Sequence, residues 1–201
     1  MMQKLLIATT NPAKTREHKE LLADLNLETI SLADFSNFKP VEKTGVSFKE
    51  NAILKAKGYF TQFHIPTLAD DGGFEIDALG GAPRVRSHRW LGRESSDGEL
   101  IKYTLKKLKG VPLEKRTARI TTWVAFYNGK NLLLERGTID GYVVKEYPNW
   151  IEKGFPWRSI LFIPEFGKLY QDLTPEEHEK INHRRKILEK LKPKIKEVLG
   201  I

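Results

Sequence analysis

The amino-acid sequence predicts one α/β domain built on a mixed β-sheet. In the first half of its 201 residues, short apolar runs alternate with stretches that open on helix-capping residues, which is typical of strands alternating with helices. In the centre, alternating apolar residues on both sides of Asn128 and Gly129 predict an antiparallel hairpin. No repeat, low-complexity tract or linker interrupts the chain, so we predict a single domain over residues 1–201.

Apolar runs and caps place the elements of the N-terminal half. Asn11 is a cap residue, and Pro12 suits the first position of a helix. Ser47 and Glu50 have the spacing of a capping box and open a second helix. The expected elements, in chain order, are a strand at 4–9, a helix at 12–23, a strand at 27–32, a helix at 47–60, and strands at 67–69 and 74–78 flanking an acidic turn.

Similar signals place the elements of the C-terminal half. Asp97 caps a helix that Gly110 ends, and Thr174 with Glu177 forms a second capping-box pattern. Because proline disfavours helix continuation, Pro193 should end the last helix. The expected elements are a helix at 97–109, strands at 116–127, 131–135 and 137–144, and a helix at 174–192.

The composition excludes several classes of site. The chain has no cysteine, which excludes disulfides, thiolate catalysis and zinc–sulfur centres. Apolar runs such as residues 160–164 are too short to cross a bilayer, and the first residues lack a signal-peptide pattern. We therefore expect a cytoplasmic protein with no membrane partner. The net charge of +8 favours an anionic partner.

Two helix starts carry residues suited to phosphate binding. The strand at 4–9 leads through hydroxyls and an amide into a helix N-terminus that carries Lys14, where a helix dipole and a lysine attract anions. An ordinary capped helix with a solvated lysine is the alternative. On the next helix Asn51 and Lys55 are four residues apart and share a face. Glu50, at the start of that helix, could serve the same substrate or only cap the helix.

Four carboxylates stand within residues 70–77: Asp70, Asp71, Glu75 and Asp77. Adjacent carboxylates repel one another unless a cation, solvent or hydrogen bonds compensate. Hard oxygen ligands without sulfur or histidine favour Mg²⁺ over zinc, and the neighbouring glycines let a ligand approach the backbone. The segment therefore predicts either a magnesium site or a solvated acidic turn. Glu75 and Asp77 alternate along a strand and could be structural.

Taken together, these motifs resemble those of the inosine triphosphate pyrophosphatase family, the XTP/dITP diphosphatases that remove nonstandard purine nucleotides. The resemblance runs from about residue 4 to residue 191. The matching segments are Thr9-Thr-Asn-Pro-Ala-Lys14, Ser47-Phe-Lys-Glu-Asn-Ala-Ile-Leu-Lys-Ala56, Ala69-Asp-Asp-Gly-Gly-Phe-Glu-Ile-Asp-Ala-Leu-Gly-Gly-Ala-Pro83, Ser87-His-Arg89 and Asn182-His-Arg184.

The resemblance implies an elongated mixed sheet in two lobes with a central nucleotide cleft, and a homodimer. It implies Mg²⁺-dependent hydrolysis at the α-phosphorus, which releases pyrophosphate, with Asp71 as the base for the attacking water. Implied metal ligands are Glu50 and Asp71, with Asp70 as a further candidate. The implied triphosphate-binding residues are Thr9, Thr10, Asn11, Lys14, Asn51, Lys55 and Gly72. The implied base-binding residues are Phe155, Trp157, Arg158, His178, His183 and Arg184.

The base-recognition segment departs from the family pattern. Residues 148–159 are one residue longer before Gly-Phe, and Arg158 stands where the family has aspartate. His178 replaces a lysine, and Gly72 replaces a serine. Arginine only donates hydrogen bonds whereas aspartate accepts them, so the base contact at this position must change. The phosphate chemistry is expected to be retained, and the preferred base is left open.

Two alternatives remain. One is a pyrophosphatase of the same fold that acts on a different base. The other is a nucleic-acid-binding protein without catalysis, favoured by the net charge and by the basic residues of 180–196. We do not expect nucleic acid as the partner, because the acidic turn repels a polyanion and the chain lacks interleaved aromatic and basic residues.

Overall fold

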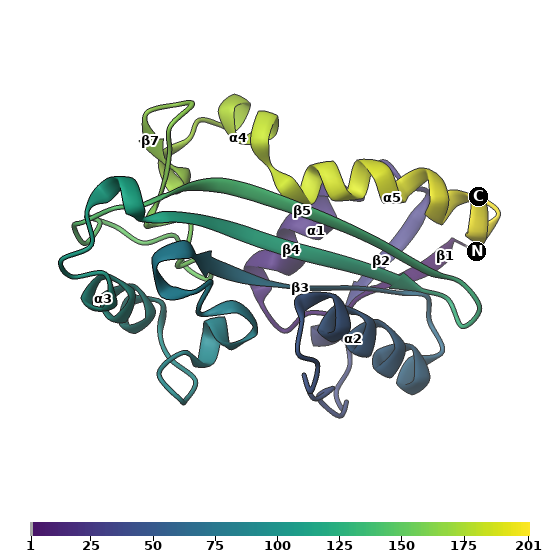
Figure 1. The fold of residues 1–201 in the computed structure, drawn as a ribbon. Coiled ribbons are helices and arrows are strands. Elements are labelled where there is room, and N and C mark those ends of the chain that lie inside the picture. Colours follow the sequence, from purple (N-terminus) through teal and green to yellow (C-terminus); the bar gives the residue numbers. More distant parts are fainter. Residues whose placement is uncertain (1) are drawn as a thin grey trace. The chain divides into compact units, whose positions relative to one another are not determined.

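A computed structural model of the chain describes residues 2–201, with the backbone alone at His88; Met1 lies outside the described residues. Within this range the strands form one seven-stranded sheet in the order β2-β1-β3-β4-β5-β6-β7 (Figure 1). β1 pairs in parallel with β2 and β3, whereas β6 pairs antiparallel with β5 and β7. The predicted mixed sheet is confirmed. The strands are β1 (Gln3–Ile7), β2 (Leu27–Ser31), β3 (Thr67–Ile76), β4 (Thr117–Tyr127), β5 (Leu132–Val143), β6 (Leu161–Ile163) and β7 (Lys168–Leu169).

The helices begin close to where their capping residues predict. Asn11 caps α1, and Thr174 forms the predicted capping box of α4. The cap of α3 is Ser96 rather than Asp97, because the Ser96 hydroxyl accepts from the Glu99 amide and Asp97 becomes the first helical residue. The α-helices among residues 2–201 are α1 (Pro12–Leu21), α2 (Phe48–Phe63), α3 (Asp97–Lys107), α4 (Pro175–Ile181) and α5 (His183–Leu199).

The predicted helix at 174–192 starts where expected, but its continuity and its end at Pro193 are wrong. The chain leaves helical geometry at Asn182, whose ψ is 105°, and α5 then continues through Pro193. Proline removes one backbone donor from the helix, but the apolar residues on both sides of Pro193, among them Leu191 and Ile195, are fully buried. Burial of this stripe outweighs the lost hydrogen bond. No helix among residues 2–201 combines the length and apolar content that crossing a membrane requires.

The described residues divide into two compact units. Unit 1 comprises residues up to 71, 122–137 and 184–201. Along its β1 and the residue that follows, Leu5 and Ile7 pack in one hydrophobic cluster with α1 and α5, whereas Leu6 and Ala8 pack in another with α2. This alternation is the two-residue period of a strand that is buried on both faces. Figure 1 shows α5 and α2 on opposite sides of these strands.

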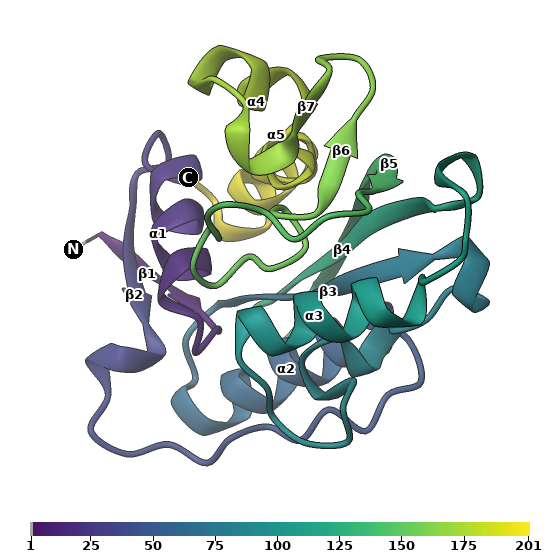
Figure 2. The same cartoon turned by 90° about the vertical axis from the view of Figure 1, so that its left-hand side faces the viewer.

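Unit 2 comprises residues 72–121 and 138–183 and has its own hydrophobic core. Phe74 of β3 stacks on Trp157, with 5.0 Å between ring centroids, and Leu100 and Ile101 bring α3 to the same core. In Figures 1 and 2, α4 lies beside β7. There the Lys168 Nζ donates to a Glu177 oxygen at 2.9 Å. The prediction of one domain, and of a nucleotide cleft within it, stays a prediction.

The predicted acidic turn at 70–73 is wrong, because β3 runs unbroken from Thr67 to Ile76. Asp70 and Asp71 are 1% and 5% exposed, so neither is a solvated carboxylate. The sequence suggested a turn because aspartate and glycine disfavour strands. In the folded chain, cations compensate the carboxylates, and the glycines allow other segments to pack closely against the strand.

Gly73 shows why this strand needs a glycine. A Cβ added at Gly73 would lie 2.1 Å from the Ser87 Oγ and 2.9 Å from the Arg84 carbonyl oxygen. The Ser87 Oγ itself accepts from the Phe74 amide at 3.1 Å and donates to the Arg84 carbonyl at 2.6 Å. Residues 84–87 are therefore held directly against β3.

We expect Gly73→Ala to lower the free energy of unfolding by about 1–3 kcal/mol through overpacking. Urea unfolding monitored by circular dichroism measures this loss. In a Ser87→Ala background, Gly73→Ala should lower the free energy of unfolding by less than it does when Ser87 is present, because the nearest clashing atom, the Ser87 Oγ, is absent. An equal cost in both backgrounds would show that this contact is not the cause.

Candidate active site

The loop after β1 and the first turn of α1 carry the predicted anion-binding residues. The Asn11 Oδ1 accepts from the amides of Ala13 at 2.9 Å and Lys14 at 3.3 Å, and Pro12 has no N–H. The amides in the first turn of α1 are therefore already hydrogen-bonded, so they are not free to bind an anion. Thr10 is exposed and the Lys14 side chain is 14% exposed, so these side chains remain to meet a ligand.

A pocket of about 560 Å³ opens beside this loop in unit 1. Its lining includes Thr9 and Thr10, which are predicted phosphate-binding residues, and two further cations of α1, Arg16 and Lys19. The sequence pattern did not single out these two cations, because surface lysines and arginines on a helix are common. The rest of the lining includes the carboxylate of Glu20 and apolar residues such as Leu32 and Phe38, so cations line only part of this pocket.

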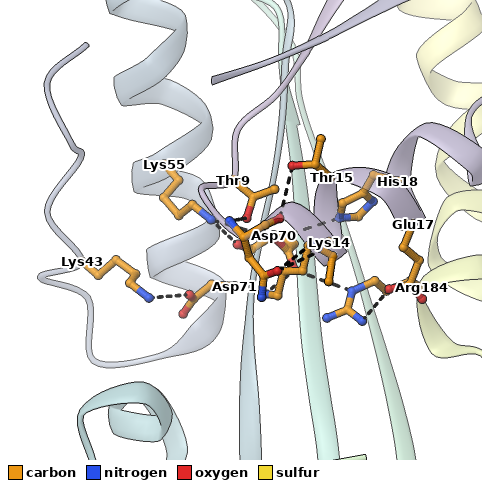
Figure 3. A network of polar contacts seen from close by, with 12 residues as sticks. Thr9, Lys14, Thr15, Glu17, His18, Lys43, Lys55, Asp70, Asp71 and Arg184 are labelled. Carbon is orange, nitrogen blue, oxygen red and sulfur yellow. Dashed lines mark hydrogen bonds and ion pairs between the residues drawn. The ribbon is translucent and has the colours of Figure 1, made fainter. Parts of the chain in front are cut away.

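Asp70 is the centre of a buried charge cluster in unit 1 (Figure 3). Its Oδ2 accepts from the Lys14 Nζ at 2.8 Å and lies 3.7 Å from the Arg184 Nε. The Lys55 Nζ donates to the Asp70 carbonyl oxygen at 2.5 Å. Burial alone would raise the pKa of the Asp70 carboxyl, but Lys14 and Lys55, followed by His18 and Arg184, hold it well below its ordinary value. Asp70 is therefore a permanent anion at neutral pH.

The cations around Asp70 are not equivalent. Burial lowers the pKa of Lys55 from 10.5 to about 8, because desolvation outweighs the attraction of Asp70. Arg184 is 4% exposed and also donates to a Glu17 oxygen at 3.1 Å. Lys14 and Lys55 are thus brought together with Arg184, although the resemblance implied that the lysines bind the phosphates and that Arg184 binds the base.

Asp71, the next residue of β3, has a different environment. Its Oδ1 lies 3.4 Å from the Lys43 Nζ, and its Oδ2 accepts from the Asn51 amide nitrogen at 3.3 Å. Both contacts are long for hydrogen bonds to a carboxylate. The Asn51 Oδ1 also accepts from the Gly45 amide at 2.9 Å, which fixes this side chain in place. Each Asp71 oxygen therefore has one long hydrogen-bond contact, and together these contacts orient the carboxylate.

Glu50 stands at the start of α2, beside Asn51. Ser47 caps the helix as predicted, but the Glu50 carboxylate accepts from the Val46 amide at 2.8 Å instead of closing the box on Ser47. No three His, Cys, Asp or Glu side chains among the described residues gather into a metal-binding group. A pair of carboxylates without sulfur or imidazole still suits Mg²⁺, which keeps phosphate and water oxygens in its shell. Glu50 and Asp71 fit that requirement.

Three of the predicted base-binding residues of unit 2, Phe155, Arg158 and His178, form a stacked group with Tyr170. The Arg158 guanidinium lies 3.8 Å from the Phe155 ring centroid and 5.1 Å from that of Tyr170. Tyr170 in turn stacks on His178 at 5.0 Å, and the Arg158 Nη1 donates to a Glu152 oxygen at 3.0 Å. The charge reversal at Arg158 is thus balanced by Glu152, and the guanidinium covers a face of Phe155.

The remaining predicted residues are placed separately. Trp157 is 6% exposed and lies in the core of unit 2 against Phe74 and Trp90, so its ring contacts the core rather than open space. His183 is buried at the start of α5, and Gly72 is partly buried in β3. The roles of these residues toward a nucleotide stay predictions.

Several residues of the two groups were not found from the sequence. Lys43 lies in an irregular loop, where no periodicity indicates its direction. Nothing in the sequence of α1 distinguishes His18 from a surface residue. In the structure it is 1% exposed, and its Nε2 lies 4.0 Å from the Asp70 Oδ1. Burial lowers the pKa of His18 to about 4, despite the attraction of Asp70, so the imidazole is neutral at pH 7. Tyr170 and Glu152 carried no motif at all.

Comparison with known proteins identifies the family. A sequence model described as the Ham1 family matches residues 5–194 of the chain. The chain belongs to the Ham1 family. The matched residues include both the charge cluster around Asp70 and the stacked group of unit 2.

Relatives support the same assignment over the whole chain. The dITP/XTP pyrophosphatase of Geobacillus kaustophilus is 40% identical over 99% of this chain and 97% of its own length. That of Bacillus cereus is 38% identical over 98% of this chain and 96% of its own length. The structure of a HAM1 protein from Coxiella burnetii has a TM-score of 0.84 at 33% identity and covers 98% of this chain and 100% of that chain. The Ham1 fold is therefore shared along the full length.

Proposed function

We propose that this Ham1 protein is a Mg²⁺-dependent nucleoside triphosphate pyrophosphatase. It hydrolyses a nucleoside or deoxynucleoside triphosphate to the monophosphate and pyrophosphate, and its substrate is a nonstandard purine nucleotide such as ITP, dITP or XTP. The observation that carries the proposal is the pair Asp70–Asp71 on β3, surrounded by Lys14, Lys55 and Lys43. The names of the relatives support the substrate class.

The residues divide the work between charge neutralisation and proton transfer. Lys14 and Lys55, with the hydroxyls of Thr9 and Thr10, bind the triphosphate and offset its negative charge. Glu50 and Asp71 would hold Mg²⁺. When bound, this ion neutralises phosphate charge and lowers the pKa of its water.

Asp71 acts on the attacking water. Its carboxylate accepts a proton from the water whose oxygen forms the new bond to the α-phosphorus. The bond between the α-phosphorus and the bridging oxygen breaks, and pyrophosphate leaves with the electron pair. Asn51 orients the carboxylate through its amide contact at 3.3 Å. Phosphoryl transfer of this type depends on alignment and charge more than on special nucleophiles.

A panel of nucleoside triphosphates tests the function. We expect Mg²⁺-dependent pyrophosphate release from ITP, dITP or XTP, with ATP and GTP much poorer substrates. Release of orthophosphate instead of pyrophosphate would place the cleavage at the wrong bond. Inactivity toward every triphosphate would contradict the enzyme assignment. A homodimer and a cytoplasmic location remain proposals that sedimentation and cell fractionation can test.

Arg158 is expected to influence which base is preferred. We expect Arg158→Asp, made in a Glu152→Gln background to avoid a pair of carboxylates, to raise the preference for ITP over ATP. Aspartate accepts from the N1–H of hypoxanthine, which adenine lacks. One such hydrogen bond corresponds to roughly a tenfold change in the ratio of kcat/KM values. Glu152→Gln alone is the control, and an unchanged ratio in the double variant would remove Arg158 from base selection.

A further inference from the structure

We propose that Asp70 is a positioning residue, whose buried carboxylate holds Lys14, Lys55 and Arg184 in place to receive a polyphosphate, and that it is not a metal ligand. This inference rests on the proposed function, since it gives Asp70 a part in the same site. It distinguishes two adjacent aspartates of one strand that a sequence motif treats as a pair.

The contacts of Asp70 come from three helices. Lys14 and His18 lie on α1, Lys55 lies on α2 and Arg184 on α5. The Lys14 Nζ is 2.8 Å and the Arg184 Nε 3.7 Å from the Asp70 Oδ2, while the Lys55 Nζ is 4.0 Å from the Oδ1. The side chain of Asp70 is 0% exposed. One anion in the sheet is therefore the common partner of cations that otherwise repel one another.

Holding these cations before the ligand arrives favours binding. Lysine has a flexible four-carbon stem, and ordering it on binding costs conformational entropy. The side chains of Lys14 and Lys55 are 14% and 13% exposed, so they are ordered by the protein yet remain accessible. The carboxylate offsets only part of the surrounding positive charge, and the remainder is available to a polyphosphate.

The same contacts leave no place for a metal ion at Asp70. A cation at the Oδ2 would face Lys14 and Arg184. The Oδ1 has no hydrogen-bond partner among the described residues, but a cation there would lie beside Lys55, whose Nζ is 4.0 Å from this oxygen. Asp71, in contrast, has one cation within ion-pair distance among the described residues, Lys43 at 3.4 Å. Like charges at such distances oppose one another strongly in a buried site. Asp71 is therefore the aspartate open to Mg²⁺.

Binding of inorganic tripolyphosphate without metal tests the proposal. Calorimetric titration in EDTA should show at least tenfold weaker binding to Asp70→Asn than to the unmodified chain. Asp71→Asn, the same isosteric change one residue later, should bind the probe as well or more tightly, because it removes an anion and leaves the cations in place. Asp77→Asn, in which the changed carboxylate pairs with Arg119, should bind like the unmodified chain.

Kinetics with Mg²⁺ provide a second readout. For Asp70→Asn we expect a raised KM, with the Mg²⁺ concentration for half-maximal rate within twofold of the unmodified value. Asp70→Glu, which keeps the charge, should recover part of the lost affinity. Tripolyphosphate affinity unchanged by Asp70→Asn, or a half-maximal Mg²⁺ concentration raised tenfold or more, would overturn the proposal.

A crystal structure of the unmodified chain with Mg²⁺ and a non-hydrolysable triphosphate decides the question even if Asp70→Asn does not fold. We expect Lys14 and Lys55 to contact phosphate oxygens while Asp70 stays outside the metal shell. An Asp70 oxygen at about 2.0–2.1 Å from Mg²⁺ would make it a ligand and end the proposal. A chain that binds tripolyphosphate but hydrolyses no nucleotide refutes only the proposed function. A chain that binds no tripolyphosphate refutes the positioning role as well.

Discussion

Asp71→Asn is expected to lower kcat by roughly 10³-fold, within the range of a lost general base, while leaving the fold intact. The amide cannot accept the proton of the attacking water and is a poorer ligand for Mg²⁺ than a carboxylate. The change preserves the volume of a residue that is 5% exposed, and neither the 3.3 Å contact to Asn51 nor the 3.4 Å contact to Lys43 is a short hydrogen bond. Circular dichroism and urea unfolding should therefore differ little from the unmodified chain.

The chain supplies a matched control within the same acidic segment. Asp77 is exposed, accepts from the Thr117 hydroxyl at 2.6 Å, and pairs with Arg119 at 2.9 Å. Asp77→Asn should leave kcat within about twofold, because these contacts are structural and exposed pairs contribute little. A near-normal rate for Asp71→Asn would remove Asp71 as the base, whatever Asp77→Asn does.

Lys55→Met is expected to lower kcat/KM by roughly 10²- to 10³-fold, the loss seen when one charge-stabilising donor is removed. Lys55 contacts Asp70 twice. Its Nζ donates to the Asp70 carbonyl oxygen and lies 4.0 Å from the Asp70 carboxylate. Lys57→Met, two residues along α2, is the control. Lys57 is exposed and lies 5.5 Å over the Tyr127 ring, so its loss should leave kcat/KM nearly unchanged.

The pH dependence of kcat/KM tests the role of Lys55 separately from the Lys55→Met variant. Because burial lowers the pKa of Lys55 to about 8, the ammonium is charged below that pH and neutral above it. The value of kcat/KM, which reports the free enzyme, should therefore fall as pH rises through 8. Lys55→Arg, which stays charged at all these values, should lose this alkaline limb. A limb that persists unchanged in Lys55→Arg would assign the titration to another group.

Much of the fold follows from local signals that the tertiary structure reinforces. Asn11 with Pro12 and Thr174 with Glu177 predicted helix starts that the structure confirms, because caps satisfy orphan amides within a few residues. The alternating run of β4 was likewise predicted to within one residue. The acidic turn in β3 and the end of the last helix at Pro193 were wrong because, at both places, a local preference met strong burial.

The candidate site divides in the same way. The residue types at Lys14, Asn51, Lys55 and Asp71 suited phosphate and magnesium chemistry but left structural alternatives open, and the resemblance to a known family assigned these residues to a site. The sequence could not separate Asp70 from Asp71, because both are carboxylates beside glycines. The sequence also showed arginine at position 158 but did not indicate its ion-pair partner. Only the fold brings a Glu152 oxygen to 3.0 Å from the guanidinium.

By itself, the sequence determined the mixed sheet, the helix starts and a set of residue types suited to an anion and a metal ion, because these depend on periodicity and on neighbours a few positions apart. Only the tertiary structure decided which charges share one buried volume. Glu17 and Arg184 are 167 positions apart, and Lys14 and Asp70 are 56 apart, yet they form one cluster. The energy of a buried charge depends on distance and desolvation in three dimensions, which sequence spacing does not encode.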